Sequence, residues 1–185
     1  IHGPVHLSNG NEEQLIDIFQ YVNEQDWVFS TWRNHYHALL HGVPPSILKE
    51  RIMQGHSIGF QAAENHFFTS AIVNGILPIA VGTALGLRWN LSGRMVWCFV
   101  GDMAAESGEF YTAVKFSARN NLPIHFVIED NDLSTNSPTQ EAWGLVNPKA
   151  VTLGIHQDVI GKYVSYYKYE RKVYPHQGIG KWIHF

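Results

Sequence analysis

Two largely apolar runs, Met95–Val100 and Ile124–Ile128, constrain the fold of this chain more than any other feature. Runs of this length suit strands of a parallel sheet that is covered on both faces. The segment between them, from Ala104 to Asn120, reads as a helix, so the three pieces form a βαβ unit. Ile76–Trp89 is apolar almost throughout and contains small residues, which predicts a buried helix. We therefore expect an α/β fold with three layers, in which helices cover both faces of a parallel sheet.

The remaining predicted elements are shorter. Apolar residues recur at helical spacing in 12–23, and 27–29 is a short apolar segment that fits a strand. A second helix is expected from Pro44-Pro45 to Gln54, because proline is favoured in the first turn. Residues 55–69 read as a polar loop, and the chain becomes irregular from Asp130 to Pro148.

Composition narrows the classes of function. The 185 residues are 45% hydrophobic but only 16% charged, well below the roughly 25% charged residues of a typical soluble domain. This indicates either a surface covered by a partner subunit or a compact monomer. A formal charge of −3 does not indicate binding to nucleic acid or to an anionic membrane. No apolar run is long enough for a membrane helix. A single cysteine, Cys98, and the lack of a cleavable leader lead us to expect a cytoplasmic protein.

Polar side chains follow both of the long apolar runs. Asp102 comes directly after the first strand, and Asn131 follows the second, 131 − 102 = 29 positions later. The carboxyl ends of parallel strands meet at one edge of a sheet, where ligands bind. A carboxylate, an amide oxygen and a backbone carbonyl suit Mg²⁺, and the N-terminus of the following helix would face a diphosphate. The alternative is that Asp102 only caps its helix and Asn131 sits in a turn.

The stretch GDMAAESGEFYTAVKFSARNNLPIHFVIEDNDLSTNSP resembles the thiamine diphosphate motif, in which Gly-Asp-Gly is followed about 30 residues later by Asn. It is most similar to the alpha subunit of the 2-oxo acid dehydrogenases, their decarboxylating component, in a truncated or divergent form. The resemblance implies Mg²⁺ ligands at Asp102, Asn131 and the carbonyl of Leu133. It also places Gly101, Met103 and Ala104 beside the cofactor.

Three further blocks extend the resemblance over residues 5–145. Val5-His6-Leu7 is similar to an N-terminal His-Leu block of the family. Thr31–His35 resembles its Tyr-Arg-x-His block, with Trp32 and Arg33 on the cofactor diphosphate, and the 27 positions from His6 to Arg33 (33 − 6) fit the family without a gap. Ala71-Ile72-Val73 resembles the segment that grips the aminopyrimidine, with Ala71 offering carbonyls and Val73 wedged under the cofactor. By the same resemblance, His6 and His35 are the candidate catalytic residues.

The pattern is broken at several points. Met103 replaces the second glycine of the motif, and Trp32 replaces a tyrosine. The resemblance implies a thiamine diphosphate-binding domain over 1–145 and leaves 146–185 as a divergent tail, packed on the same domain or on a partner.

The glutamate that activates the pyrimidine ring comes from the beta subunit in this family. Glu64, Glu106 and Glu109 are candidates by residue type only. The resemblance therefore implies a thiamine diphosphate- and Mg²⁺-dependent subunit that acts on a small 2-oxo acid and needs a pyrimidine-binding beta-type partner in a homo- or hetero-oligomer. A transketolase-like subunit that transfers an aldehyde unit, or a non-catalytic thiamine diphosphate-binding assembly subunit, are the alternatives.

Overall fold

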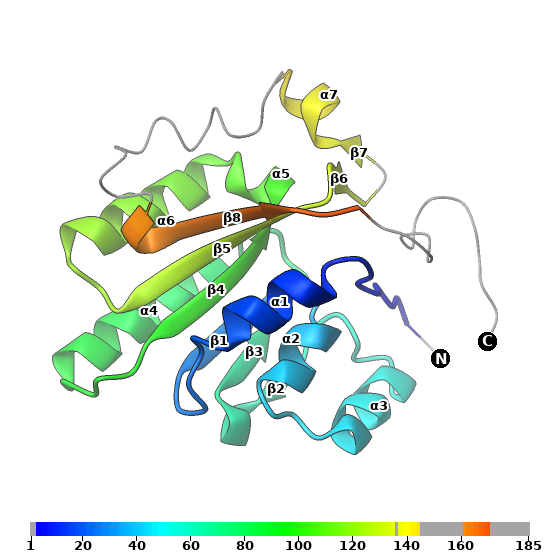
Figure 1. Ribbon diagram of the computed structural model, residues 1–185, viewed down its shortest axis with the longest axis horizontal. Coiled ribbons are helices and arrows are strands. Elements are labelled where there is room, and N and C mark those ends of the chain that lie inside the picture. The colour runs from blue at the N-terminus through cyan, green and yellow to red at the C-terminus, as the bar shows by residue number, and fades with distance from the viewer. Residues whose placement is uncertain (1–2, 136, 145–160, 171–185) are drawn as a thin grey trace.

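A computed structural model describes residues 3–135, 137–144 and 161–170 (Figure 1). Its main sheet has six strands in the order β2-β3-β1-β4-β5-β8, and every neighbouring pair is parallel except β2 with β3. The strands are β1 (Trp27–Ser30), β2 (Gln61–Ala62), β3 (Phe67–Thr69), β4 (Val96–Gly101), β5 (Ile124–Asp130) and β8 (Val164–Lys168), with a small separate ribbon of β6 (Leu133–Ser134) and β7 (Ser137–Pro138).

Helices cover both faces of this sheet, which confirms the predicted α/β class (Figure 1). One group packs on one face through α4 and α6, and the other group packs on the opposite face through α1, α2 and α3. The helices are α1 (Glu12–Phe19), α2 (His35–Leu40), α3 (Pro45–Met53), α4 (Ile76–Trp89), α5 (Asp102–Ala105), α6 (Gly108–Arg119) and α7 (Thr139–Trp143), with a 3-10 turn at Ala63–Asn65.

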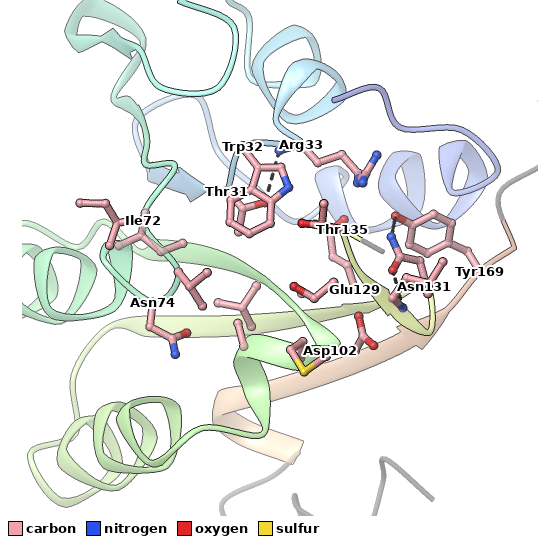
Figure 2. Close-up of a pocket in the computed structure, with 18 residues that line it drawn as sticks. Thr31, Trp32, Arg33, Ile72, Asn74, Asp102, Glu129, Asn131, Thr135 and Tyr169 are labelled. Atoms are coloured by element: carbon pink, nitrogen blue, oxygen red, sulfur yellow. Dashed lines mark hydrogen bonds between the residues drawn. The ribbon is translucent and has the colours of Figure 1, made fainter. Parts of the chain in front are cut away.

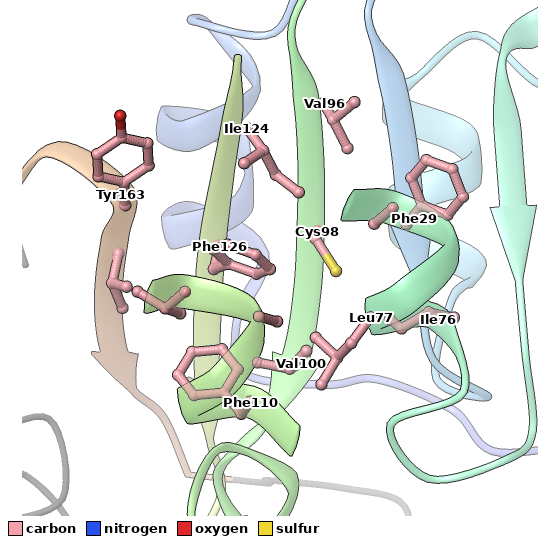
Figure 3. Close-up of a cluster of buried hydrophobic side chains, with 14 of the residues drawn as sticks. Phe29, Ile76, Leu77, Val96, Cys98, Val100, Phe110, Ile124, Phe126 and Tyr163 are labelled. Carbon is pink, nitrogen blue, oxygen red and sulfur yellow. The ribbon is translucent and has the colours of Figure 1, made fainter. Parts of the chain in front are cut away.

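The side chains of β4 contribute to two hydrophobic clusters, one on each face of the sheet. Val96, Cys98 and Val100 point into the cluster formed with α4 and α6 (Figure 3). Phe99, between them, points into the cluster formed with α1, α2 and α3. Successive side chains of a strand alternate between faces, so an unbroken apolar run fills both cores. Burying each of these large side chains stabilises the fold by about 1.5 to 3 kcal/mol.

The structure corrects two local predictions and adds one helix. Residues 55–69 are not a simple loop, because Phe67–Thr69 pairs with β1 in parallel register. The segment 35–40 forms α2, which the sequence did not indicate as a helix. The predicted helix from Ala104 to Asn120 is two helices. The first ends at Ala105, and Ser107 caps the second by accepting a hydrogen bond from Phe110 N.

The described part of the predicted tail joins the main sheet. β8 pairs with β5 in parallel, with Val164 opposite Phe126 and Lys168 opposite Asp130. Residues 145–160 and 171–185 lie outside the described residues, so the division of the chain near residue 145 stays a prediction. Within the described ranges, none of the helices combines the length and hydrophobicity that crossing a bilayer requires.

Candidate functional site

A pocket opens at the carboxyl ends of β1, β4 and β5 (Figure 2). The first strand of the chain lies between β3 and β4, so the strand order reverses direction at this point of the sheet. Open α/β sheets bind ligands at such a switch point. The pocket is lined by Thr31, Trp32, Arg33, Ile72, Val73, Asn74, Ile76, Val100, Gly101, Asp102, Met103, Ala104, Glu129, Asn131, Leu133, Ser134, Thr135 and Tyr169.

Most residues that the sequence nominated for cofactor or metal binding line this one pocket. They come from three segments that are far apart in the chain, around residues 32, 73 and 102, together with the segment after β5. Ala71 is the exception, since it is exposed and is not among the lining residues. The nominated residues in the pocket are Trp32, Arg33, Val73, Gly101, Asp102, Met103, Ala104, Asn131 and Leu133.

Asp102 is a buried carboxylate at the end of β4, with 3% of its surface exposed. Burial raises the pKa of its carboxyl to about 6, and the nearby Asp130 carboxylate acts in the same direction. The Thr139 hydroxyl donates a hydrogen bond to Oδ2, and this bond and the backbone of Asn131 oppose the rise of the pKa. The arrangement costs free energy unless a cation or a proton neutralises the carboxylate.

Asn131 lies directly after β5, and both the oxygen and the nitrogen of its side-chain amide form hydrogen bonds. Its Oδ1 accepts a hydrogen bond of 3.0 Å from Leu133 N, and its Nδ2 donates one of 3.2 Å to the Tyr169 hydroxyl (Figure 2). An amide oxygen has two lone pairs, so Oδ1 keeps one for a further partner. Leu133 lines the pocket two residues later, at the start of β6.

Arg33 follows β1 and supplies the positive charge of the site. Its side chain is 7% exposed and donates to the carbonyl of Leu7, which joins the N-terminal segment to the rim of the pocket. A guanidinium offers a planar fork of five donors, which suits phosphate oxygens. The segment around His6 and the one around Arg33 are thus neighbours in space.

The two nominated histidines stand beside Arg33 rather than among the lining residues. His35 is buried in α2, and its Nε2 lies 2.9 Å from the Ser57 hydroxyl. The His6 ring packs at a tilt against the Trp32 ring, with centroids 5.9 Å apart. Burial and the Arg33 charge lower the pKa of each histidine to about 4, so both rings are neutral at pH 7. A catalytic role for either stays a prediction.

The donor set fits a diphosphate with a divalent cation. A carboxylate at Asp102 and an amide oxygen at Asn131 are hard ligands of the kind that Mg²⁺ prefers. A Cβ built on Gly101 would meet no atom within 4 Å, so the space above the end of β4 is open to a bound group. Among the described residues there is no cluster of three or more His, Cys, Asp or Glu side chains for a metal, so a site here depends on amide and backbone oxygens. One expectation is corrected: the helix that follows β4 is α5, which has only four residues, so a long helix does not start there.

The glutamates nominated by type do not line the pocket, whereas Glu129 does. Glu64 and Glu109 are exposed. Glu106 is half-buried, and desolvation followed by the charges of Asp102 and Asp130 raises its pKa to about 7. Glu129 is the penultimate residue of β5, and its Oε1 lies 3.1 Å from Nε2 of His37. Sequence reasoning missed this pair, because 92 positions separate its members and neither has a local motif of its own.

The chain matches a family model described as the dehydrogenase E1 component, over residues 1–157. It is 33% identical over 141 residues to the alpha subunit of acetoin:2,6-dichlorophenolindophenol oxidoreductase from Cupriavidus necator, covering 71% of this chain and 42% of the relative. It is 31% identical over 146 residues to the alpha subunit of the pyruvate dehydrogenase E1 component from Porphyra purpurea, covering 70% and 42%. This chain therefore spans less than half the length of these relatives. With its fold and its match over most of the sequence, it belongs to the dehydrogenase E1 component family.

Proposed function

We propose that the pocket binds the diphosphate of thiamine diphosphate together with Mg²⁺, and that the chain is the alpha-type part of a 2-oxo acid dehydrogenase. The observation that carries the proposal is the meeting of Asp102, Asn131 and Arg33 in one pocket at the carboxyl ends of neighbouring strands. These residues come from three separate segments and have the chemistry that a metal diphosphate needs.

In this proposal each residue has a defined task. Asp102 and Asn131 offer side-chain oxygens to the cation, and Leu133 offers its backbone carbonyl. Arg33 binds phosphate oxygens, with Trp32 as a donor beside it. Met103 and Ala104 bring the first turn of α5 next to the diphosphate, and Val73 supports the centre of the cofactor. When bound, the cofactor supplies the carbanion and electron-sink chemistry of 2-oxo acid decarboxylation, and the protein supplies position and electrostatics.

The proposal includes a pyrimidine-binding beta-type partner and a small 2-oxo acid as the substrate. Two observations support a partner. Ile72 and Val73 at the rim of the pocket are 74% and 53% exposed, which is unusual for aliphatic side chains beside a ligand site. In addition, Glu64, Glu106 and Glu109 do not line the pocket, so none of the nominated glutamates is positioned to activate the pyrimidine.

Calorimetric titration with thiamine diphosphate in the presence of Mg²⁺ tests the binding. We expect Asp102→Asn to abolish Mg²⁺-dependent binding, because the neutral amide keeps the shape of the side chain but loses the charge that attracts the cation. Asp17→Asn on the exposed face of α1 is the matched control, since it removes the same charge far from the pocket. The proposal is wrong if the unsubstituted chain does not bind, alone or with a beta-type partner.

A second experiment separates a catalytic subunit from a non-catalytic binder. The chain is mixed with a beta-type subunit, and decarboxylation of a 2-oxo acid is followed with an artificial electron acceptor. Turnover that requires both chains and is lost in Asp102→Asn supports the dehydrogenase. Binding without turnover favours the assembly subunit, and transfer of an aldehyde unit between sugars favours the transketolase-like alternative.

A further inference from the structure

Strand β8 and the residue after it pair one to one with four consecutive residues of the segment that ends β5. The Tyr167 and Tyr166 hydroxyls donate to carboxylates, Asn131 donates to a tyrosine hydroxyl, and a lysine forms an ion pair of 2.7 Å. The pairs are Glu129 with Tyr167, Asp130 with Tyr166, Asn131 with Tyr169 and Asp132 with Lys168. This segment of the tail is the one that resembles no family block in the sequence.

The register of the sheet explains why the pairs alternate between faces. Glu129 lies opposite Tyr167, and Asp130 lies opposite Lys168. The ladder continues one step beyond the strand, because Tyr169 N donates to the carbonyl of Asp130 at 2.9 Å. Glu129, Asn131 and Tyr169 thus line the pocket, whereas Asp130 and Asp132 are not among its lining residues.

The contact between Tyr169 and Asn131 bears directly on a proposed ligand. If the amide were flipped, its Nδ2 would face Leu133 N, and two donors would meet. In the observed orientation Nδ2 has the Tyr169 hydroxyl as its acceptor, and Oδ1 is on the side of Leu133. Tyr169 is itself 6% exposed, so its hydroxyl is held in place.

We infer that β8 is a positioning strand for the loop 129–132, and that Tyr169 fixes the orientation in which Asn131 presents Oδ1 to the cation. The inference rests on the proposed function, since it concerns a ligand of the proposed Mg²⁺. Tyr169 acts here through Asn131 and is a positioning residue. The tail that follows the family-like part of the chain is thereby assigned a role in the cofactor site.

The test uses Tyr169→Phe, which removes only the hydroxyl. The Mg²⁺ dependence of thiamine diphosphate binding is measured by calorimetry, on the chain alone and with a beta-type partner. We expect the dissociation constant for Mg²⁺ to rise roughly fivefold, as loss of one hydrogen bond implies. Tyr163→Phe is the matched control, because Tyr163 is a buried tyrosine just before the same strand that packs in the core cluster. We expect no change in Mg²⁺ affinity for this control.

A double substitution distinguishes orientation of the amide from a general loss of structure. In an Asn131→Asp background either carboxylate oxygen can face the cation, so orientation no longer matters. We expect the effect of Tyr169→Phe on Mg²⁺ affinity to fall below about twofold there. Equal effects in both backgrounds would mean that Tyr169 only stabilises the fold, and the inference would be wrong.

A measurement without ligand completes the test. The side-chain amide resonances of Asn131 in a ¹⁵N-correlated spectrum should move in Tyr169→Phe and stay in place in Tyr163→Phe. Absence of binding by the unsubstituted chain overturns the proposed function and this inference together. Normal binding by the unsubstituted chain with unchanged Mg²⁺ affinity in Tyr169→Phe overturns this inference alone.

Discussion

His37 and Glu129 meet behind the pocket, with Nε2 and Oε1 3.1 Å apart and with 0% and 8% of their side chains exposed. The other ring nitrogen of His37 lies 3.0 Å from the Ser30 hydroxyl, and the Tyr167 hydroxyl donates to the same carboxylate. The contact therefore joins α2, β1, β5 and β8 under the floor of the proposed site.

Removing His37 should destabilise the whole domain. We expect His37→Ala to lower the free energy of unfolding by roughly 3 kcal/mol, because Glu129 stays buried without one of its partners. Urea denaturation measures the change, and His56→Ala is the control, since His56 is exposed. A change within about 0.5 kcal/mol for both variants would mean that the pair does not hold the elements together.

His35 should make stability depend on pH. Its pKa is about 4 in the folded chain, from burial and then from the charges of Arg33 and His37, against an ordinary value of 6.5. Between these values the unfolded chain binds a proton that the folded chain does not, so stability falls as the pH drops from 6.5 toward 4.

The difference between His35→Gln and the unsubstituted chain isolates this effect. We expect protonation of His35 in the unfolded chain to lower the free energy of unfolding by about 2 to 3 kcal/mol at pH 4. Above pH 7 we expect this effect to vanish. Free energies of unfolding measured at several pH values give the slope for each protein, and His56→Gln controls for the loss of an exposed histidine. Parallel slopes for His35→Gln and the unsubstituted chain would contradict the prediction.

Thr139 should support the proposed metal ligand. Its side chain is buried, and its hydroxyl donates to Asp102. Thr139→Val keeps the shape but leaves the carboxylate without this donor, so we expect Mg²⁺-dependent thiamine diphosphate binding to weaken about tenfold. Thr112→Val is the control, because Thr112 is exposed and donates only within α6. Equal affinities of Thr139→Val and Thr112→Val would show that the hydroxyl does not position Asp102.

Met103 offers a test in which affinity and stability move in opposite directions. Met103→Gly should tighten thiamine diphosphate binding, because a glycine lets the diphosphate approach the backbone after β4. It should also lower the free energy of unfolding by about 1 kcal/mol, since glycine is unfavourable in a helix. Met53→Gly at the end of α3 should lower stability without altering affinity. Unchanged binding in Met103→Gly would mean that the side chain does not limit access to the pocket.

The parts of the fold that could be predicted from the sequence are those with long, mostly apolar segments. β4, β5 and α4 are mostly apolar along their length, and their positions agree closely with the predicted ranges. β3 has only three residues, and α2 is rich in histidine, so neither has a clear periodic pattern. Their conformations depend on tertiary partners, which are β1 for β3 and the α1 and α3 helices for α2.

The residues of the candidate site also fall into two groups, those that the sequence could nominate and those that only the structure reveals. Asp102 and Asn131 each follow a predicted strand, and Arg33 lies in a block that resembles the family, so all three could be nominated from the sequence together with that resemblance. Tyr169 and Thr139 gain their importance only from neighbours 38 and 37 positions away. Hydrogen bonds between distant side chains leave no periodicity in a single sequence, and only the folded structure reveals them.

β8 is the last strand in the order of the described sheet, and only β5 is paired with it there. The other five strands keep all of their ladders to one another whether or not β8 is present. An edge strand of this kind can change in sequence during evolution with little disturbance to the core. Each substitution of its tyrosines, however, removes hydrogen bonds that hold the loop 129–132. Sequence change in the least family-like part of the chain would thus alter the affinity of the proposed metal site while its proposed ligands stay the same.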